Sequence, residues 1–168
     1  MRRIIVDSGS SIKAEEKEQY GVDILPIWLQ MGNESFLDGV NLSTEEFYRR
    51  LKDSRQFPKT SLPSLEETQK LVDFYTNQGD EVLIITISSG ISGTYQAIKM
   101  LFVEYENVTV FDSRLAVGGI RFLVEEANRY KQETMETVIH KLNQLLPRIM
   151  IAAVPETLDY LLAGGRLS

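Results

Sequence analysis

The hydrophobic positions of the chain fall into short blocks separated by amphipathic stretches. The runs at residues 4–6, 82–87 and 108–111 are rich in β-branched and aliphatic residues and lack polar alternation. Such runs are typical of strands buried on both faces of a parallel sheet. The run at 149–154 has the same character, so we expect a fourth strand there. Residues 22–29 and 35–37, separated by Met31-Gly32-Asn33, predict an edge hairpin or an extended excursion from the sheet.

Between these runs the sequence predicts helices. Ser43 with Glu46, and Ser64 with Glu67, form capping boxes that mark two helix starts. Apolar residues at helical spacing predict further helices at 95–103, 117–130, 134–146 and 158–162. Strands that alternate with helices predict an α/β fold: an open, mostly parallel sheet with helices on both faces, in three layers.

Composition narrows the classes of partner. The chain has 168 residues, enough for one domain with its own core, and a formal net charge of -6. A chain without a basic stripe is a poor match for nucleic acid or an anionic membrane surface. It contains no cysteine, no secretory signal pattern and no apolar run of membrane-spanning length. We therefore expect a cytoplasmic protein with no stable membrane insertion.

Small polar residues follow three of the predicted strands. Asp7 and Ser8 follow the first, Ser88 and Ser89 the second, and Asp112 and Ser113 the third. The carboxyl ends of parallel strands share one edge, where open α/β sheets bind their ligands. Asp and Ser are also preferred helix caps, and capping is the better account of Asp7, Ser8, Asp112 and Ser113 taken singly.

Two hydroxyl-rich segments, residues 59–64 and 88–95, stand where helices are expected to begin. Free backbone N–H groups at a helix start attract anions, and nearby hydroxyls add hydrogen-bond donors. Ser64 already serves as a cap, which leaves Thr60 and Ser61 without a structural task. Gly93 permits close approach of a ligand to the backbone beside Ser92. We predict that Thr60 and Ser92 hold one acidic group, with support from Ser61, Gly93 and Thr94.

Several sharper motifs are missing from the sequence. It contains neither a phosphate-binding Gly-rich fingerprint nor the Gly-x-Ser-x-Gly elbow of hydrolases. The single histidine, His140, falls on the polar flank of a predicted helix and is interpreted as a surface residue. We predict no metal site and no cofactor, and we expect Trp28 and Tyr95 to lie in the core.

Taken together, the motifs resemble those of the DegV family of fatty-acid-binding proteins. The resemblance covers nearly the whole chain in order, and its most specific parts are the Thr-Ser-x-Pro-Ser and Ser-Gly-Thr-Tyr segments. The residues that carry it are Val6-Asp7-Ser8, Asp38-Gly39, Thr60-Ser61-x-Pro63-Ser64, Ser88-Ser89-x-Ile91-Ser92-Gly93-Thr94-Tyr95, Phe111-Asp112-Ser113 and Gly164-Gly165-Arg166.

The resemblance implies a two-lobed protein that holds a long-chain fatty acid in an apolar tunnel, its carboxylate bound by Thr60 and Ser92. It also implies that the protein is not an enzyme but presents the fatty acid to an ATP-dependent fatty acid kinase, which makes acyl phosphate for phospholipid synthesis. Arg166 is then a candidate for contact with the kinase. The family's second lobe lies outside residues 1–168, which we expect to be the N-terminal lobe of a longer protein.

Two alternatives remain open at this point. In the first alternative, the chain is a phosphoryl-transfer or hydrolytic enzyme that uses Asp7 or Asp112 as nucleophile or magnesium ligand. In the second alternative, the chain is an interaction domain that binds no small ligand, and the hydroxyl-rich segments serve only as helix caps.

Overall fold

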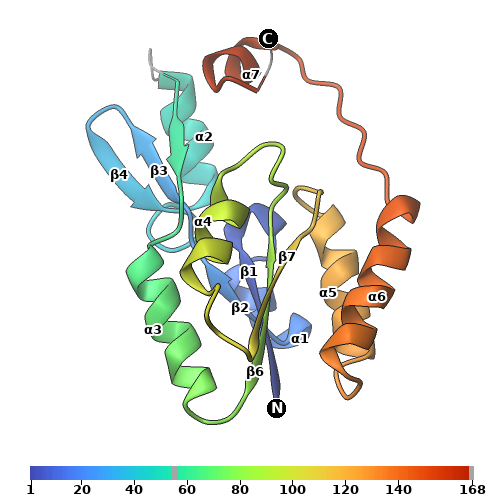
Figure 1. The fold of residues 1–168 in the computed structure, drawn as a ribbon. Coiled ribbons are helices and arrows are strands. Elements are labelled where there is room, and N and C mark those ends of the chain that lie inside the picture. Colours follow the sequence, from blue (N-terminus) through green and yellow to red (C-terminus); the bar gives the residue numbers. More distant parts are fainter. Residues whose placement is uncertain (54–56, 167–168) are drawn as a thin grey trace.

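A four-stranded parallel sheet forms the centre of the molecule. The computed structural model describes residues 1–53 and 57–166 (Figure 1). The strand order is β2-β1-β6-β7, with bounds β1 Arg2–Asp7, β2 Val22–Leu25, β6 Glu81–Thr86 and β7 Val108–Asp112. In this register Ile4 pairs with both Val22 and Leu83, and Ile84 pairs with Val110. The three predicted parallel strands are confirmed, although β7, at the edge of the sheet, is only partly buried.

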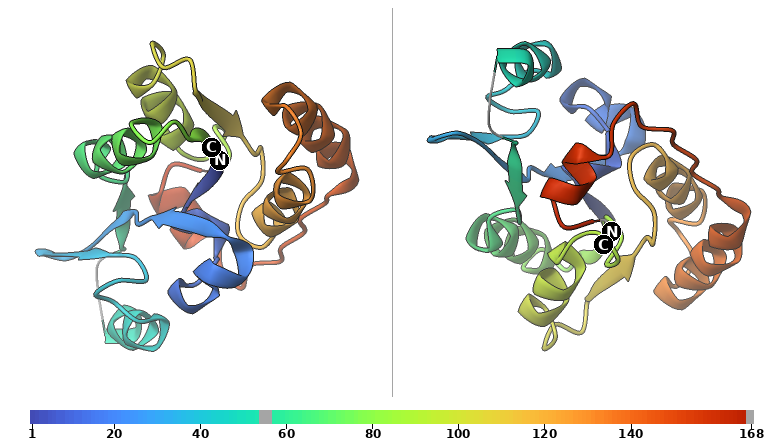
Figure 2. Two further views of the ribbon diagram at one scale, coloured as in Figure 1. Left: turned by 90° about the horizontal axis from the view of Figure 1, so that it is seen from below. Right: turned by 90° about the horizontal axis from the view of Figure 1, so that it is seen from above.

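Helices cover both faces of this sheet, as the two further views make clear (Figure 2). On one face α3 (Leu65–Thr76) and α4 (Thr94–Leu101) enclose a core with Ile5, Ile84 and Ile98. On the other, α5 (Gly119–Arg129) and α6 (Met135–Leu145) enclose a core with Ile4 and Leu83. Successive strand residues point to opposite faces, which explains why the central residues of β1 and β6, among them Ile4, Ile5, Leu83 and Ile84, are all apolar. The predicted three-layer fold is confirmed.

A second, antiparallel sheet stands beside the first. It has the order β4-β3-β5 and consists of β3 (Trp28–Met31), β4 (Glu34–Leu37) and β5 (Lys59–Ser61). The prediction of one hairpin from 22 to 37 was wrong in part, because residues 22–25 join the parallel sheet as β2. Pro26 explains the break, since proline cannot donate a ladder hydrogen bond. The β3–β4 hairpin itself is confirmed.

The fourth predicted strand was wrong. Residues 149–154 form an extended segment that leads from a 3-10 turn at Leu146–Arg148 to the short helix α7 (Asp159–Ala163). Val154 is 97% exposed, and none of the described strands pairs with the segment. An apolar run becomes a buried strand only where it pairs with a neighbouring edge under a covering layer, and this segment pairs with neither edge strand of the parallel sheet, β2 or β7. Figures 1 and 2 show α7 beyond the carboxyl edge of the parallel sheet, where Tyr160 meets Phe57 edge-to-face at 5.2 Å.

The helix starts follow the local sequence closely. Ser43 Oγ accepts a hydrogen bond from Glu46 N at the start of α2 (Thr44–Asp53), and Ser64 Oγ accepts one from Glu67 N at the start of α3. Both predicted caps are confirmed. The remaining helical segments are the short α1 (Lys17–Tyr20) and 3-10 turns at Ser8–Ser10 and Ala14–Glu16. None of the helices in residues 1–53 and 57–166 has the length and apolar character needed to cross a membrane.

Candidate functional site

Asp7 ties together two of the loops at the carboxyl edge of the parallel sheet. Its Oδ1 accepts a hydrogen bond from Gly9 N at 2.9 Å, and its Oδ2 accepts one from Ile87 N at 2.7 Å. The residue is 1% exposed. Beside it, Ser8 Oγ accepts from Ile27 N at 3.2 Å and so anchors the approach to β3. Both residues therefore position the backbone of neighbouring segments.

Burial raises the pKa of Asp7 to about 6, although the N–H groups of Ile87 and Gly9 act in the opposite direction. Desolvation disfavours the charged carboxylate, whereas hydrogen bonds donated to it favour the charged form. Each carboxylate oxygen has a backbone partner, and the side chain is closed off from solvent. This arrangement suits a structural brace better than a nucleophile or a magnesium ligand.

Asp112 supports the same edge from β7. Its Oδ1 accepts hydrogen bonds from Ser89 N and Arg114 N, both at 3.0 Å, and its Oδ2 accepts one from Ser89 Oγ at 2.5 Å. Next to it, the buried Ser113 hydroxyl accepts from Leu115 N and donates to Leu115 O, both at 3.1 Å. The β6–α4 loop is therefore held by Asp7 on one side and Asp112 on the other.

The loop held in this way carries Ser92. Ser88 O accepts hydrogen bonds from Ile91 N and Ser92 N, which folds the loop into a tight turn directly before α4. The cap position of α4 is Gly93, and no described side chain caps the helix there. Ser92 Oγ accepts from Thr94 N at 3.3 Å and lies 2.8 Å from Thr94 Oγ1. A partly buried hydroxyl thus stands at the start of α4, where it already accepts one backbone N–H.

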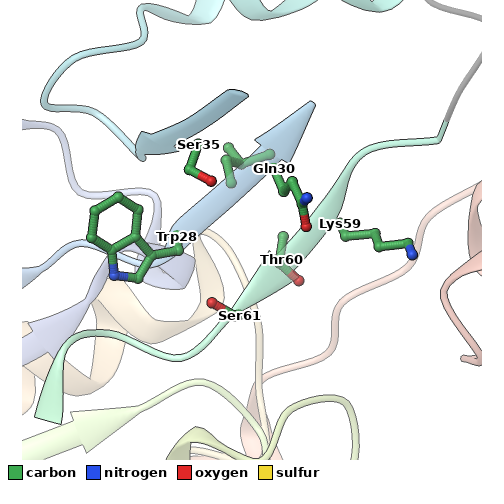
Figure 3. Close-up of a pocket in the computed structure, with 7 residues that line it drawn as sticks. Trp28, Gln30, Ser35, Lys59, Thr60 and Ser61 are labelled. Carbon is green, nitrogen blue, oxygen red and sulfur yellow. The ribbon is translucent and has the colours of Figure 1, made fainter. Parts of the chain in front are cut away.

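Thr60 and Ser61 lie in strand β5, not in a turn before α3, so the expected local structure was wrong. Thr60 pairs with Leu29 and Ser61 with Trp28, because β5 completes the free edge of β3. Both hydroxyl residues are exposed. They line a cavity of about 150 Å³ together with Trp28, Gln30, Ser35 and Lys59 (Figure 3). Trp28 is 37% exposed, so its predicted place in the core was also wrong.

The segments that carry Thr60 and Ser92 are neighbours in space. Leu62 follows β5 directly, and its Cδ2 would lie 3.9 Å from a Cβ atom built on Gly93. The two hydroxyl-rich segments, about thirty positions apart in sequence, therefore meet at the carboxyl edge of the parallel sheet. Whether both hydroxyls reach one ligand atom stays a prediction.

A larger cavity of about 840 Å³ lies between residues 8–17 and 38–45, and sequence analysis did not predict it. Its walls combine apolar side chains, among them Ile12 and Leu42, with Lys13 and Glu45. The only signal in the sequence was Asp38-Gly39, where the chain turns at a φ of 71°. Within residues 1–53 and 57–166, no group of three or more acidic or histidine side chains is arranged to hold a metal ion.

Comparison with known proteins identifies the family. The model described as uncharacterised protein, DegV family, matches residues 1–168. The chain belongs to the DegV family. It is 33% identical over 169 residues to a DegV domain-containing protein of Caldanaerobacter subterraneus, covering 98% of this chain and 60% of the relative. A second relative, from Streptococcus pneumoniae, is 29% identical over 170 residues with the same coverage.

Solved DegV structures have the same fold. A fatty-acid-binding DegV family protein from Thermus thermophilus superposes with a TM-score of 0.84 at 26% identity, covering 99% of this chain and 60% of that one. A DegV lipid-binding protein from Thermotoga maritima gives 0.83 at 30% identity, with 98% and 61% coverage. A fatty-acid-binding DegV protein from Streptococcus agalactiae gives 0.85 at 27% identity, with 100% and 61% coverage. The chain thus spans about 60% of the length of these relatives.

Arg166 is exposed and follows the short helix α7. Its Nη1 donates a hydrogen bond to Gly164 O at 2.8 Å, which folds the side chain back on its own turn. The resemblance predicts contact with a partner for Arg166, and this stays a prediction. His140 is exposed on α6, as the sequence indicated.

Proposed function

We propose that this DegV domain binds a long-chain fatty acid whose carboxylate is held by Thr60 and Ser92. The observation that carries the proposal is the nearness of Leu62 to Gly93, since the Leu62 side chain would lie 3.9 Å from a Cβ atom built on the glycine and the two hydroxyl-rich segments therefore lie beside each other. Ser61 and Thr94, the backbone at Gly93, and the braces Asp7, Ser8, Asp112 and Ser113 support this site. Relatives with the same fold are described as fatty-acid-binding proteins, which supports the same ligand here.

The head-group chemistry is that of an anion at a helix start. The free N–H groups of the first turn of α4 and the helix dipole favour negative charge, and the hydroxyls of Thr60 and Ser92 add donors. A hydrogen bond to a charged group contributes about 1.5 to 3 kcal/mol. Two hydroxyls and the helix start can therefore orient a carboxylate without a buried lysine or arginine.

The tail supplies most of the affinity in this proposal. Each buried methylene contributes about 0.8 kcal/mol, so roughly fifteen of them contribute about 12 kcal/mol before the costs of association. Apolar side chains in the loops at the carboxyl edge of the parallel sheet are exposed, among them Ile91 at 41% and Val117 at 50%. We propose that these residues form part of an apolar tunnel, which the second lobe of the whole protein completes.

The biochemical role we propose is delivery of the fatty acid to an ATP-dependent kinase in the cytoplasm, for acyl-phosphate formation in phospholipid synthesis. In this scheme the DegV protein is not itself the catalyst, it needs no cofactor, and Arg166 contacts the kinase. The hydrogen bonds of Asp7 and Asp112 support a non-catalytic role, since each carboxylate already braces a loop. This weakens the alternative of a phosphoryl-transfer or hydrolytic enzyme.

The decisive experiment is native mass spectrometry of the full-length gene product after gentle purification. We expect one acyl chain per protein, and exchange of that chain for added palmitate or oleate. Purified kinase with ATP should then convert the bound acid into acyl phosphate. A lipid-free protein that takes up neither acid would overturn the proposal, whereas uptake without phosphorylation would overturn the kinase step alone.

A further inference from the structure

The buried hydroxyl of Thr94 has one hydrogen-bond partner among the described residues, Ser92 Oγ. Thr94 is the first residue of α4 and is 1% exposed. Its Oγ1 lies 2.8 Å from Ser92 Oγ, and by distance alone either oxygen could be the donor. The burial of the two side chains decides which hydroxyl donates the hydrogen bond.

The burial of the two residues differs. Buried hydroxyl groups in folded proteins are almost always hydrogen-bonded, since no water is available to replace a missing partner. If Ser92 donated to Thr94, the hydrogen of the Thr94 hydroxyl would face the protein interior with no acceptor in the described residues. If Thr94 donates instead, the hydrogen of the half-exposed Ser92 hydroxyl can still reach a ligand or water. Thr94 is therefore the donor.

Ser92 Oγ accepts a second hydrogen bond, from Thr94 N at 3.3 Å. A serine hydroxyl has two acceptor lone pairs and one hydrogen. Both lone pairs are then used by Thr94, and only the O–H of Ser92 remains for a ligand. An ionised carboxylate has acceptor oxygens only, so it matches a hydroxyl that can only donate.

We infer that Thr94 is a positioning residue that makes Ser92 an obligate hydrogen-bond donor and thereby selects an ionised carboxylate over a neutral head group. The inference rests on the proposed function and deepens it, because it names what sets the chemical selectivity of the Ser92 side of the site. Thr94 acts through Ser92 and not by touching the ligand.

The test compares palmitate with 1-hexadecanol, whose tail has the same length and whose head group is neutral. In the full-length protein, Thr94→Val should weaken palmitate binding about tenfold, the effect of losing one well-oriented hydrogen bond to a charge. Binding of 1-hexadecanol should change less than about twofold, since a neutral head group gains little from a fixed donor. Thr94→Ser, which keeps the hydroxyl, should restore the preference for the acid.

A double-mutant cycle separates positioning from general damage to the helix start. In a Ser92→Ala background, Thr94→Val should cause no further loss of palmitate affinity, because the group on which Thr94 acts is gone. If Thr94→Val does not fold, as judged by circular dichroism, Thr94→Ala takes its place in both backgrounds. Equal losses for acid and alcohol, or additive effects in the cycle, would overturn the inference. Failure of the wild-type protein to bind palmitate would overturn the proposed function instead.

Discussion

The carboxylate of Asp7 accepts a hydrogen bond from Ile87 N across the ends of two adjacent parallel strands, at 2.7 Å. This contact joins residues 80 positions apart, and Asp7 accepts a second bond from Gly9 N. Ile87 opens the loop that carries Ser92, so the position of that loop depends on a carboxylate from the first strand. A buried acid used in this way makes the stability of the domain depend on pH.

We expect Asp7 to lower the stability of the domain as the pH rises from about 4 to about 6. Burial raises its pKa from 3.8 to about 6, so in this range the folded state binds more protons than the unfolded state. Stability therefore falls with rising pH across this window and is constant, as far as Asp7 is concerned, outside it. The shift corresponds to a change on the order of 3 kcal/mol in the free energy of unfolding.

The measurement is urea unfolding of the wild type and of Asp7→Asn at pH 4, 5, 6 and 7. Glu46, whose hydrogen bonds to Arg49 and Arg50 lower its pKa to about 2, acts in the opposite direction below pH 4.5, but it does so equally in both proteins. The free energy of unfolding of the wild type minus that of Asp7→Asn should therefore decrease as the pH rises from about 4 to about 6. A difference that is flat from pH 4 to 7 would show that Asp7 keeps an ordinary pKa.

Gly9 is the second residue that the Asp7 brace requires. A Cβ atom at this position would lie 2.7 Å from Asp7 Oδ1 and 2.8 Å from Ile87 Cδ1, both closer than non-bonded contact allows. Gly9→Ala should therefore lower the free energy of unfolding by about 1 to 3 kcal/mol, as overpacking does. Gly118→Ala is a matched control, because nothing lies within 4 Å of its Cβ position. Thermal unfolding should show a loss in the first variant and none in the second.

Removal of either head-group hydroxyl should weaken fatty-acid binding in the full-length protein. Thr60→Ala and Ser92→Ala each delete one hydrogen bond to a charge, about 1.5 to 3 kcal/mol, which corresponds to roughly a 10- to 150-fold loss of affinity. Thr60→Ser keeps the hydroxyl and serves as the control. Isothermal titration with palmitate measures all three variants. Wild-type affinity in both alanine variants would remove Thr60 and Ser92 from the site.

The parts of the fold that depend on local sequence were predictable. Ser43 and Ser64 cap their helices through hydrogen bonds that span three residues, so the sequence pattern carries the whole interaction. Pro26 was a further local signal that residues 22–29 could not form one strand. Tertiary partners decided the rest. The strand β5 exists because β3 offers it a free edge, whereas residues 149–154 pair with no described strand and, apart from Ile149, are exposed.

In the candidate site, too, some features follow from local sequence and others depend on tertiary contacts. The sequence indicated that polar residues gather at the carboxyl edge, because parallel strands place their ends together. It could not show that Asp7 would brace Ile87, since the register of β1 and β6 brings together residues far apart along the chain. Nor could it show that Leu62 would lie near Gly93, the neighbourhood on which the proposed site depends.

A final prediction concerns how α2 is attached to the antiparallel sheet. None of the residues of α2 is buried. Arg50 lies over the ring of Phe36 at 4.8 Å, and its Nη1 forms an ion pair with Glu34 at 2.6 Å. Arg49, the adjacent residue, forms its ion pairs with Glu46 and Asp53, both within the helix. Arg50 also pairs with Glu46 within the helix, through Nε at 2.6 Å, so it contributes both to the helix and to its attachment, whereas the ion pairs of Arg49 lie within the helix alone.

Arg50→Gln should therefore speed amide hydrogen exchange in both α2 and the β3–β4 hairpin, because it removes a contact that links them. Arg49→Gln should affect exchange within α2 and leave the hairpin at its wild-type rate. Hydrogen-exchange mass spectrometry resolves the two segments in one experiment. Unchanged exchange of the hairpin in Arg50→Gln would mean that backbone pairing alone holds the antiparallel sheet in place. In that case α2 would be free to move without disturbing Thr60, which lies on the other edge of β3.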